Sequence, residues 1–153
     1  MKRILIVEDD AALRLDLTQT IEDWGYEVRN ASSGVNGSRL ILEWEPHLVL
    51  CDINMPLMSG PDLRHKMLES HKEKSDIAFL FMSASAPVST KGVGLDMAAD
   101  GFVAKPINYN ALRDKIQTQL IIYGSDRFGA RKVVAGVGAF LGIMFVCLAF
   151  RMF

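Results

Sequence analysis

The residues best suited to chemistry in this sequence are polar side chains that directly follow short apolar runs. Asp52 follows the apolar residues 48–51 and precedes the turn signal at 53–56. A run of this kind is typical of a fully buried parallel strand. Ligands bind just outside the carboxyl ends of such strands in an open α/β sheet. An acid at this point is costly to bury and well placed to react or to bind a cation.

The same arrangement recurs after three more strand candidates. The polar residues concerned are Glu8, Asp9 and Asp10 after residues 2–7, Ser83 after residues 77–82, and Lys105 after residues 101–104. If the strands are parallel, these side chains share one edge of the sheet. Each alone has a simpler reading, such as a solvated loop acid, a helix N-cap for Asp10 or a surface lysine. The recurrence therefore carries more weight than any single residue.

Strand and helix patterns alternate along the first 120 or so residues. Gly25 and Pro46 stop two of the helices, Ser33 and Asn108 are candidate N-caps, and Pro61 suits a first helical turn. This alternation predicts a doubly wound (βα)5 α/β fold with a parallel sheet. The predicted strands are 4–7, 26–29, 48–51, 77–82 and 102–104, and the predicted helices are 13–24, 33–44, 61–70, 89–98 and 108–120.

Composition limits the other possibilities. A chain of 153 residues with a net charge of −1 is expected to form one globular domain and gives no electrostatic reason to expect nucleic-acid binding. Cys51 and Cys147 lie far apart inside apolar runs, so buried thiols in a reducing compartment are expected. The sequence has no Cys/His cluster with zinc-site spacing.

Residues 133–150 form an 18-residue run without a charged side chain. As a helix the run would measure about 27 Å, close to the ~30 Å hydrocarbon core, and Lys132 and Arg151 could reach the interfaces. We expect a transmembrane helix here, with a buried core helix as the alternative. Three of the four nearby cations precede the run, so we expect the folded domain on the cytoplasmic side of the inner membrane. Gly138 and Gly142 match a helix-pairing motif that would form a homodimer, but the signal is weak and lipid-facing glycines are the alternative.

The residues at the strand ends, taken together, resemble the receiver domain of two-component response regulators. The resemblance covers residues 1–122 and leaves 123–132 as a linker before the transmembrane helix at 133–150. It also implies a flavodoxin-like sheet with strand order 2-1-3-4-5. The motifs that carry it are Glu8-Asp9, Asp52-x-Asn54-Met55-Pro56, Ser83-Ala84 and Lys105-Pro106, the last with a cis bond as the family pattern.

The resemblance assigns a role to each of these residues. It makes Asp52 the phosphoacceptor, with Lys105 and Ser83 contacting phosphate oxygens and Phe102 as the switching aromatic. It also implies a Mg²⁺ site formed by Glu8, Asp9, Asp52 and the backbone carbonyl of Asn54. These types suit phosphoryl transfer, which requires positioning and charge neutralisation, and a carboxylate nucleophile requires no activating base.

We therefore expect a membrane-tethered response regulator that a histidine kinase or histidine phosphotransfer protein phosphorylates. It would signal to a downstream protein that the sequence does not name, and it would not turn over an external substrate as an enzyme. A phosphohydrolase of the haloacid-dehalogenase kind is an alternative, but it needs an acid where this chain has Asn54. A phosphorylation-independent scaffold is the other alternative. The glycines Gly92 and Gly94 within the expected fourth helix depart from the family pattern. We also expect a transmembrane segment, rather than an output domain, after residue 122.

Overall fold

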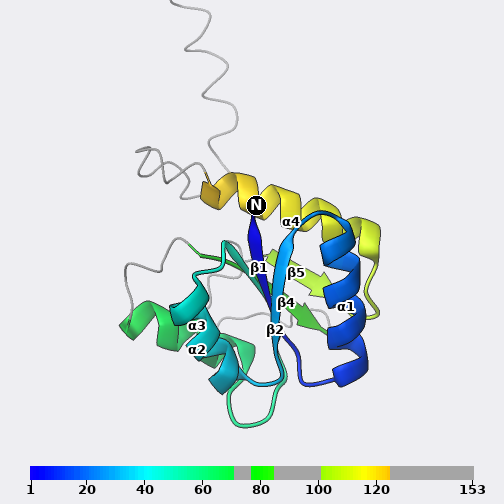
Figure 1. Cartoon of the computed structure of the whole chain (residues 1–153). Coiled ribbons are helices and arrows are strands. Elements are labelled where there is room, and N and C mark those ends of the chain that lie inside the picture. The colour runs from blue at the N-terminus through cyan, green and yellow to red at the C-terminus, as the bar shows by residue number, and fades with distance from the viewer. Residues whose placement is uncertain (71–76, 85–100, 125–153) are drawn as a thin grey trace, which may run out of the picture.

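The computed structural model describes residues 1–70, 77–84 and 101–124, and these residues form a parallel sheet flanked by helices (Figure 1). The five strands lie in the order β2-β1-β3-β4-β5, as predicted, and every neighbouring pair is parallel. The elements are β1 Arg3–Val7, α1 Ala11–Asp23, β2 Glu27–Ala31, α2 Gly34–Trp44, β3 Leu48–Asp52, α3 Gly60–Ser70, β4 Ala78–Ser83, β5 Gly101–Ala104 and α4 Tyr109–Gly124.

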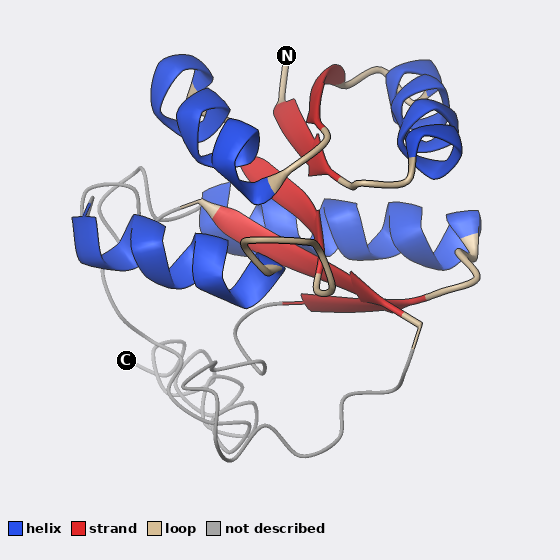
Figure 2. Cartoon of the chain, turned by 90° about the horizontal axis from the view of Figure 1, so that it is seen from below, coloured by secondary structure: helices blue, strands red, loops and turns tan. Residues whose placement is uncertain are grey.

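The sheet buries apolar side chains on both faces, because helices cover each side of it (Figure 2). Alternate residues of one strand point to opposite faces. Ile4 and Ile6 of β1 thus pack with α1 and α4, whereas Leu5 and Val7 pack with α2 and α3. This two-sided burial explains why β1, β3 and β4 read as continuous apolar runs.

The helix ends follow from local hydrogen bonding. The Asp10 carboxylate accepts hydrogen bonds from the backbone N–H groups of Ala12 and Leu13, at 2.9 and 3.0 Å, and so caps α1 as predicted. Ser33 caps α2 through the N–H of Asn36 at 3.2 Å. Gly25 follows α1 with φ of +88°, a conformation that glycine adopts without steric cost.

The observed boundaries correct several predictions. The second strand runs over Glu27–Ala31 rather than 26–29, because its pairing with β1 extends to Ala31 opposite Val7. Helix α4 continues through Tyr123 and Gly124, the first two residues of the predicted linker. Tyr123 extends the buried face of α4, since it packs against the same core as Leu120.

Three predicted segments fall wholly outside the described residues. They are the helix at 89–98, the rest of the linker at 125–132 and the apolar run at 133–150. None of the helices in the described part of the chain is long and apolar enough to cross a membrane.

Candidate functional site

The carboxyl ends of four strands converge on one edge of the sheet, because all of these strands run in the same direction. Asp52 is the last residue of β3 and is only 6% exposed. Glu8 directly follows β1, Ser83 ends β4 and Lys105 directly follows β5. The structure therefore brings together polar residues that are separated by up to 97 positions in the chain.

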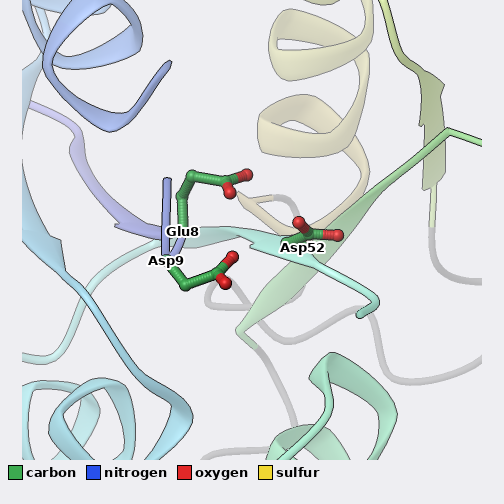
Figure 3. A group of neighbouring side chains, drawn as sticks. All are labelled: Glu8, Asp9 and Asp52. Atoms are coloured by element: carbon green, nitrogen blue, oxygen red, sulfur yellow. The ribbon is translucent and has the colours of Figure 1, made fainter. Parts of the chain in front are cut away.

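Three carboxylates form the centre of the site. Glu8, Asp9 and Asp52 each place one oxygen within 4.8 Å of the others, and Figure 3 shows the three side chains around a common space. Glu8 is almost fully buried, whereas Asp9 is exposed. The cluster is thus closed on the protein side and open to solvent at Asp9.

Lys105 joins two of these carboxylates. Its Nζ donates to Asp52 Oδ2 at 2.6 Å and to Glu8 Oε2 at 2.9 Å. Burial disfavours the ammonium charge, but the bonds to Asp52 and Glu8 outweigh it and raise the pKa of Lys105. The peptide bond between Lys105 and Pro106 is cis, as the family pattern implies.

In Glu8, unlike in Lys105, the effect of burial on the pKa outweighs that of the hydrogen bonds. Desolvation raises its pKa, although the hydrogen bond from Lys105 and another from the Asp10 N–H act in the opposite direction. One ammonium is shared between two buried carboxylates, so the bonds from Lys105 do not offset the desolvation of Glu8. The site therefore holds more negative charge than Lys105 alone can neutralise.

The loop after β3 fixes the orientation of Asp52. The backbone N–H of Asn54 donates to Asp52 Oδ1 at 3.1 Å, and the Asn54 residue itself is exposed. Gly60, the first residue of α3, packs against the same strand end, where a Cβ would lie 2.5 Å from the Asp52 carbonyl oxygen. Only glycine allows this approach of α3 to β3.

Ser83 and Phe102 lie on the two strands beyond Asp52. Ser83 is 5% exposed, and its carbonyl oxygen accepts a hydrogen bond from the Lys105 backbone N–H at 2.8 Å. Phe102 is half-buried in β5, opposite Phe81 of β4, and packs against the core on the α2 and α3 side of the sheet. Ser83 thus lies at the same edge of the sheet as Asp52, whereas Phe102 lies within β5, the strand that precedes Lys105.

Arg14 of α1 is a contact that the sequence analysis missed. Its Nη1 donates to the carbonyl oxygens of Glu8 and Asp9, at 2.7 and 3.3 Å. One sequence signal was available: Arg14 lies near the N-terminus of α1, where the helix dipole favours anions over cations. A cation at this position indicates a compensating partner.

The donor set fits a hard divalent cation. Three carboxylates meet within 4.8 Å, and one of them is open to water. Mg²⁺ prefers oxygen ligands and retains several waters, so a small, partly exposed carboxylate cluster suits it. The residues that could hold the ion are Glu8, Asp9 and Asp52.

Comparison with known sequences agrees with the receiver-domain resemblance of the strand-end residues. A family model for the response regulator receiver domain matches residues 4–117. The chain is 28% identical over 120 residues to the DNA-binding dual master transcriptional regulator RpaA of Synechocystis sp., with 78% of this chain and 49% of that protein covered. It is 32% identical over 105 residues to the aerobic respiration control protein ArcA of Escherichia coli, with 69% and 42% covered. The chain thus spans less than half the length of these curated relatives.

Solved structures agree with this comparison. A CheY-like receiver domain protein from Methanospirillum hungatei superposes with a TM-score of 0.71 at 32% identity, covering 82% of this chain and 98% of that one. The response regulator TrrA from Thermotoga maritima, solved in complex with Mg²⁺-BeF, gives a TM-score of 0.68 at 28% identity, covering 78% and 99%. With the family model, the strand order and the site in agreement, the chain belongs to the response regulator receiver domain family.

Proposed function

We propose that this protein is a phosphoacceptor response regulator of a two-component phosphorelay and that Asp52 receives the phosphoryl group. The observation that carries this proposal is the Asp52 carboxylate, held 2.6 Å from Lys105 Nζ and beside the carboxylates of Glu8 and Asp9. A buried nucleophile, a cation and a divalent-metal ligand set thus lie at one edge of the sheet. Such an arrangement suits phosphoryl transfer, which depends on positioning and charge neutralisation.

The proposed donor is a phosphohistidine on a sensor histidine kinase or a histidine phosphotransfer protein. A carboxylate oxygen of Asp52 forms a bond to phosphorus while the phosphorus–nitrogen bond breaks. The bonding electron pair leaves with the imidazole nitrogen, which then takes a proton from solvent. Before transfer, Asn54 and Lys105 hold the Asp52 carboxylate in one orientation, through bonds of 3.1 and 2.6 Å.

The other residues act on the charge and on the product. Lys105 neutralises phosphoryl oxygens as they approach the acid cluster, and Ser83 donates a hydrogen bond to one of them after transfer. Mg²⁺ held by Glu8, Asp9, Asp52 and the Asn54 carbonyl would supply further charge neutralisation. Phe102, half-buried on β5, is the proposed switch that reports phosphorylation to the surface.

We propose that the output is a contact with a downstream protein. The net charge of −1 gives no support for direct binding to nucleic acid by these residues. RpaA is named as a DNA-binding regulator, but the match to this chain covers only 49% of that protein. The reaction is self-modification, so turnover of an external substrate is not part of the proposal.

Labelling with a small phosphodonor tests the phosphoacceptor proposal. Phosphoramidate and Mg²⁺ should add one phosphoryl group to the full chain, as measured by intact mass. Asp52→Asn should abolish the addition, whereas Asp114→Asn, which changes an exposed acid on α4, should leave it unchanged. Full labelling of Asp52→Asn would contradict the assignment.

We also propose that residues 133–150 attach the receiver to the inner membrane, with the receiver in the cytoplasm and pairing of these segments through Gly138 and Gly142. The support is the 18-residue run without charge and the excess of Lys and Arg before it. Attachment would confine the receiver near membrane-bound sensor kinases and raise their effective concentration.

Membrane fractionation tests this second proposal. The full chain should sediment with membranes and resist extraction by high salt. A chain ending at Lys132, or one carrying Phe140→Asp with Ile143→Asp, should move to the soluble fraction. Recovery of the full chain in the soluble fraction would overturn the anchor but would leave the proposed phosphorylation of Asp52 unaffected.

A further inference from the structure

Arg14 reaches from α1 to the backbone of the acid pair rather than to a carboxylate. Its Nη1 lies 2.7 Å from the Glu8 carbonyl oxygen and 3.3 Å from that of Asp9. A terminal guanidinium nitrogen carries two N–H groups, so a single nitrogen can serve both acceptors. Arg14 therefore spans the two consecutive peptide units that carry the candidate metal ligands.

These two carbonyl groups come just after the strand ladder stops. The last residue of β1, Val7, is paired with Ala31 on one side and Cys51 on the other. Beyond it, the Glu8 N–H still donates to the Ala31 carbonyl at 3.1 Å. The carbonyl oxygens of Glu8 and Asp9 turn to Arg14 instead, so Arg14 supplies the donors that fix the direction of both peptide planes.

Arg14 is itself held firmly. Its backbone N–H donates to the Asp10 carbonyl at 2.9 Å, in the first turn that the Asp10 side chain caps. Its carbonyl oxygen accepts the Thr18 hydroxyl at 2.7 Å, and Thr18 in turn accepts from Asn30 at 3.1 Å. The guanidinium thus connects the start of α1 to the end of β1.

We propose that Arg14 is a positioning residue for the divalent-metal site: it fixes the Glu8–Asp9 backbone so that both carboxylates face Asp52. This inference rests on the proposed Mg²⁺ site. Two effects of Arg14 oppose each other there. Its positive charge repels a divalent cation, whereas the orientation of the two acids favours binding. Groups that orient metal ligands in this way typically contribute 10- to 100-fold in affinity.

The opposed signs allow a clear test with Arg14→Met, which removes the charge and the donors but retains a long side chain. If Arg14 acts by positioning, Mg²⁺ should bind about tenfold more weakly in a calorimetric titration of the full chain. The Mg²⁺ concentration that half-saturates phosphorylation should rise similarly, with the rate at saturating Mg²⁺ within about twofold of wild type. Equal or tighter Mg²⁺ binding by the variant overturns the proposal.

A matched control separates positioning from a general loosening of α1. Arg113 of α4 packs its guanidinium over the Trp24 ring, 5.7 Å from the centroid, at the opposite end of α1. Arg113→Met should therefore leave Mg²⁺ affinity unchanged. A tenfold loss in this control as well would overturn the specific role of Arg14, and thermal unfolding without Mg²⁺ shows whether both variants are folded.

Carbonyl ¹³C chemical shifts of Glu8 and Asp9 report the contact directly. Both should move in Arg14→Met and stay in place in Arg113→Met, and no movement in Arg14→Met overturns the proposal. The titration uses Mg²⁺ alone, so it does not depend on phosphorylation. A wild-type chain that binds Mg²⁺ but accepts no phosphoryl group counts against the proposed function and leaves the role of Arg14 standing.

Discussion

At the scale of single residues, the main feature of the site is an excess of carboxylates over cations at the strand ends. Lys105 forms ion pairs with the buried carboxylates of Glu8 and Asp52, and the exposed Asp9 adds a third carboxylate to the cluster. A buried ion pair stabilises a fold only modestly, but removing one partner leaves an uncompensated charge. The site therefore has unneutralised negative charge, which favours the binding of a further cation.

Replacing Lys105 by methionine should destabilise the fold in Mg²⁺-free buffer at neutral pH. Breaking a buried pair costs roughly 3–5 kcal/mol, and the partial exposure of this site reduces the expected loss to about 2 kcal/mol. Chemical denaturation measures the loss, and Lys115→Met on the exposed face of α4 is the control. Equal stability of the two variants would contradict the role given to Lys105.

The pH dependence of stability should reflect Glu8. Its pKa is raised above the ordinary value of 4.5, chiefly by desolvation, so the folded state holds the proton more tightly than the unfolded chain. The contribution of Glu8 is then greatest below pH 4.5 and is lost as the pH rises through the folded pKa. Glu8→Gln should remove this loss and be more stable than wild type at neutral pH without Mg²⁺.

Denaturation curves from pH 4 to 8 without Mg²⁺ measure this difference. Glu43→Gln, which changes an exposed acid paired with Arg39, is the control and should follow the wild-type pH dependence. A Glu8→Gln variant whose stability falls in parallel with wild type across this range would show that Glu8 is not the responsible group.

Much of the site was predictable from residue types and their places at strand ends. The position of Asp52 after a buried run identified it, and the choice of Glu8 and Asp9 over Asp10 agrees with Asp10 capping α1. Arg14 was not identified, because its partners are backbone carbonyls. A backbone group carries no sequence signature, so the place of Arg14 near the N-terminus of α1 could indicate a partner but could not identify it.

At the scale of elements, the approach of α3 to β3 controls the position of Asp52. The Gly60 N–H donates to the Ile53 carbonyl at 3.1 Å, and a Cβ at Gly60 would lie 2.5 Å from the Asp52 carbonyl oxygen and 3.2 Å from Cys51 Sγ. Contacts this short require backbone movement. The start of α3 and the end of β3, which carries Asp52, are thus mechanically linked.

Gly60→Ala should therefore destabilise the fold by about 1–3 kcal/mol, the usual cost of overpacking, and should also slow labelling of Asp52. Denaturation and phosphoramidate labelling measure the two effects. Lys66→Ala, an exposed change on the same helix, should alter neither. If Gly60→Ala were as stable as wild type, the backbone near Asp52 could move at little cost, and the predicted constraint on the approach of α3 to β3 would be wrong.

Element types were more predictable than their ends. Burial on both faces made β1, β3 and β4 clear from their apolar runs, and α4 showed its inward-facing Leu112 and Ile116. The edge strand β2 has only one neighbour, so the polar residues Arg29 and Asn30 are tolerated in it. Its end at Ala31 is set by pairing with β1, which local sequence does not encode.

At the scale of the whole molecule, the site exists only when distant strands are assembled. The two bonds of Lys105 join residues 97 and 53 positions apart. An ion that binds the assembled cluster therefore binds the folded state in preference to the unfolded chain. Metal binding and global stability should be coupled.

Mg²⁺ should accordingly raise the melting temperature of the receiver. At a concentration 100 times its dissociation constant, the expected gain in unfolding free energy is about 2.7 kcal/mol. Asp9→Asn, which removes the exposed ligand, should reduce this gain, and KCl at equal ionic strength is the control. A melting temperature that does not depend on Mg²⁺ would contradict the metal site.

The identity of the modified residue tests the central claim most directly. The chain is phosphorylated with phosphoramidate and Mg²⁺, the acyl phosphate is reduced with borohydride, and the peptides are sequenced by mass spectrometry. Our account predicts homoserine at position 52, with Glu8 and Asp9 unmodified. Reduction at either of those acids, or elsewhere with Asp52 intact, would contradict it.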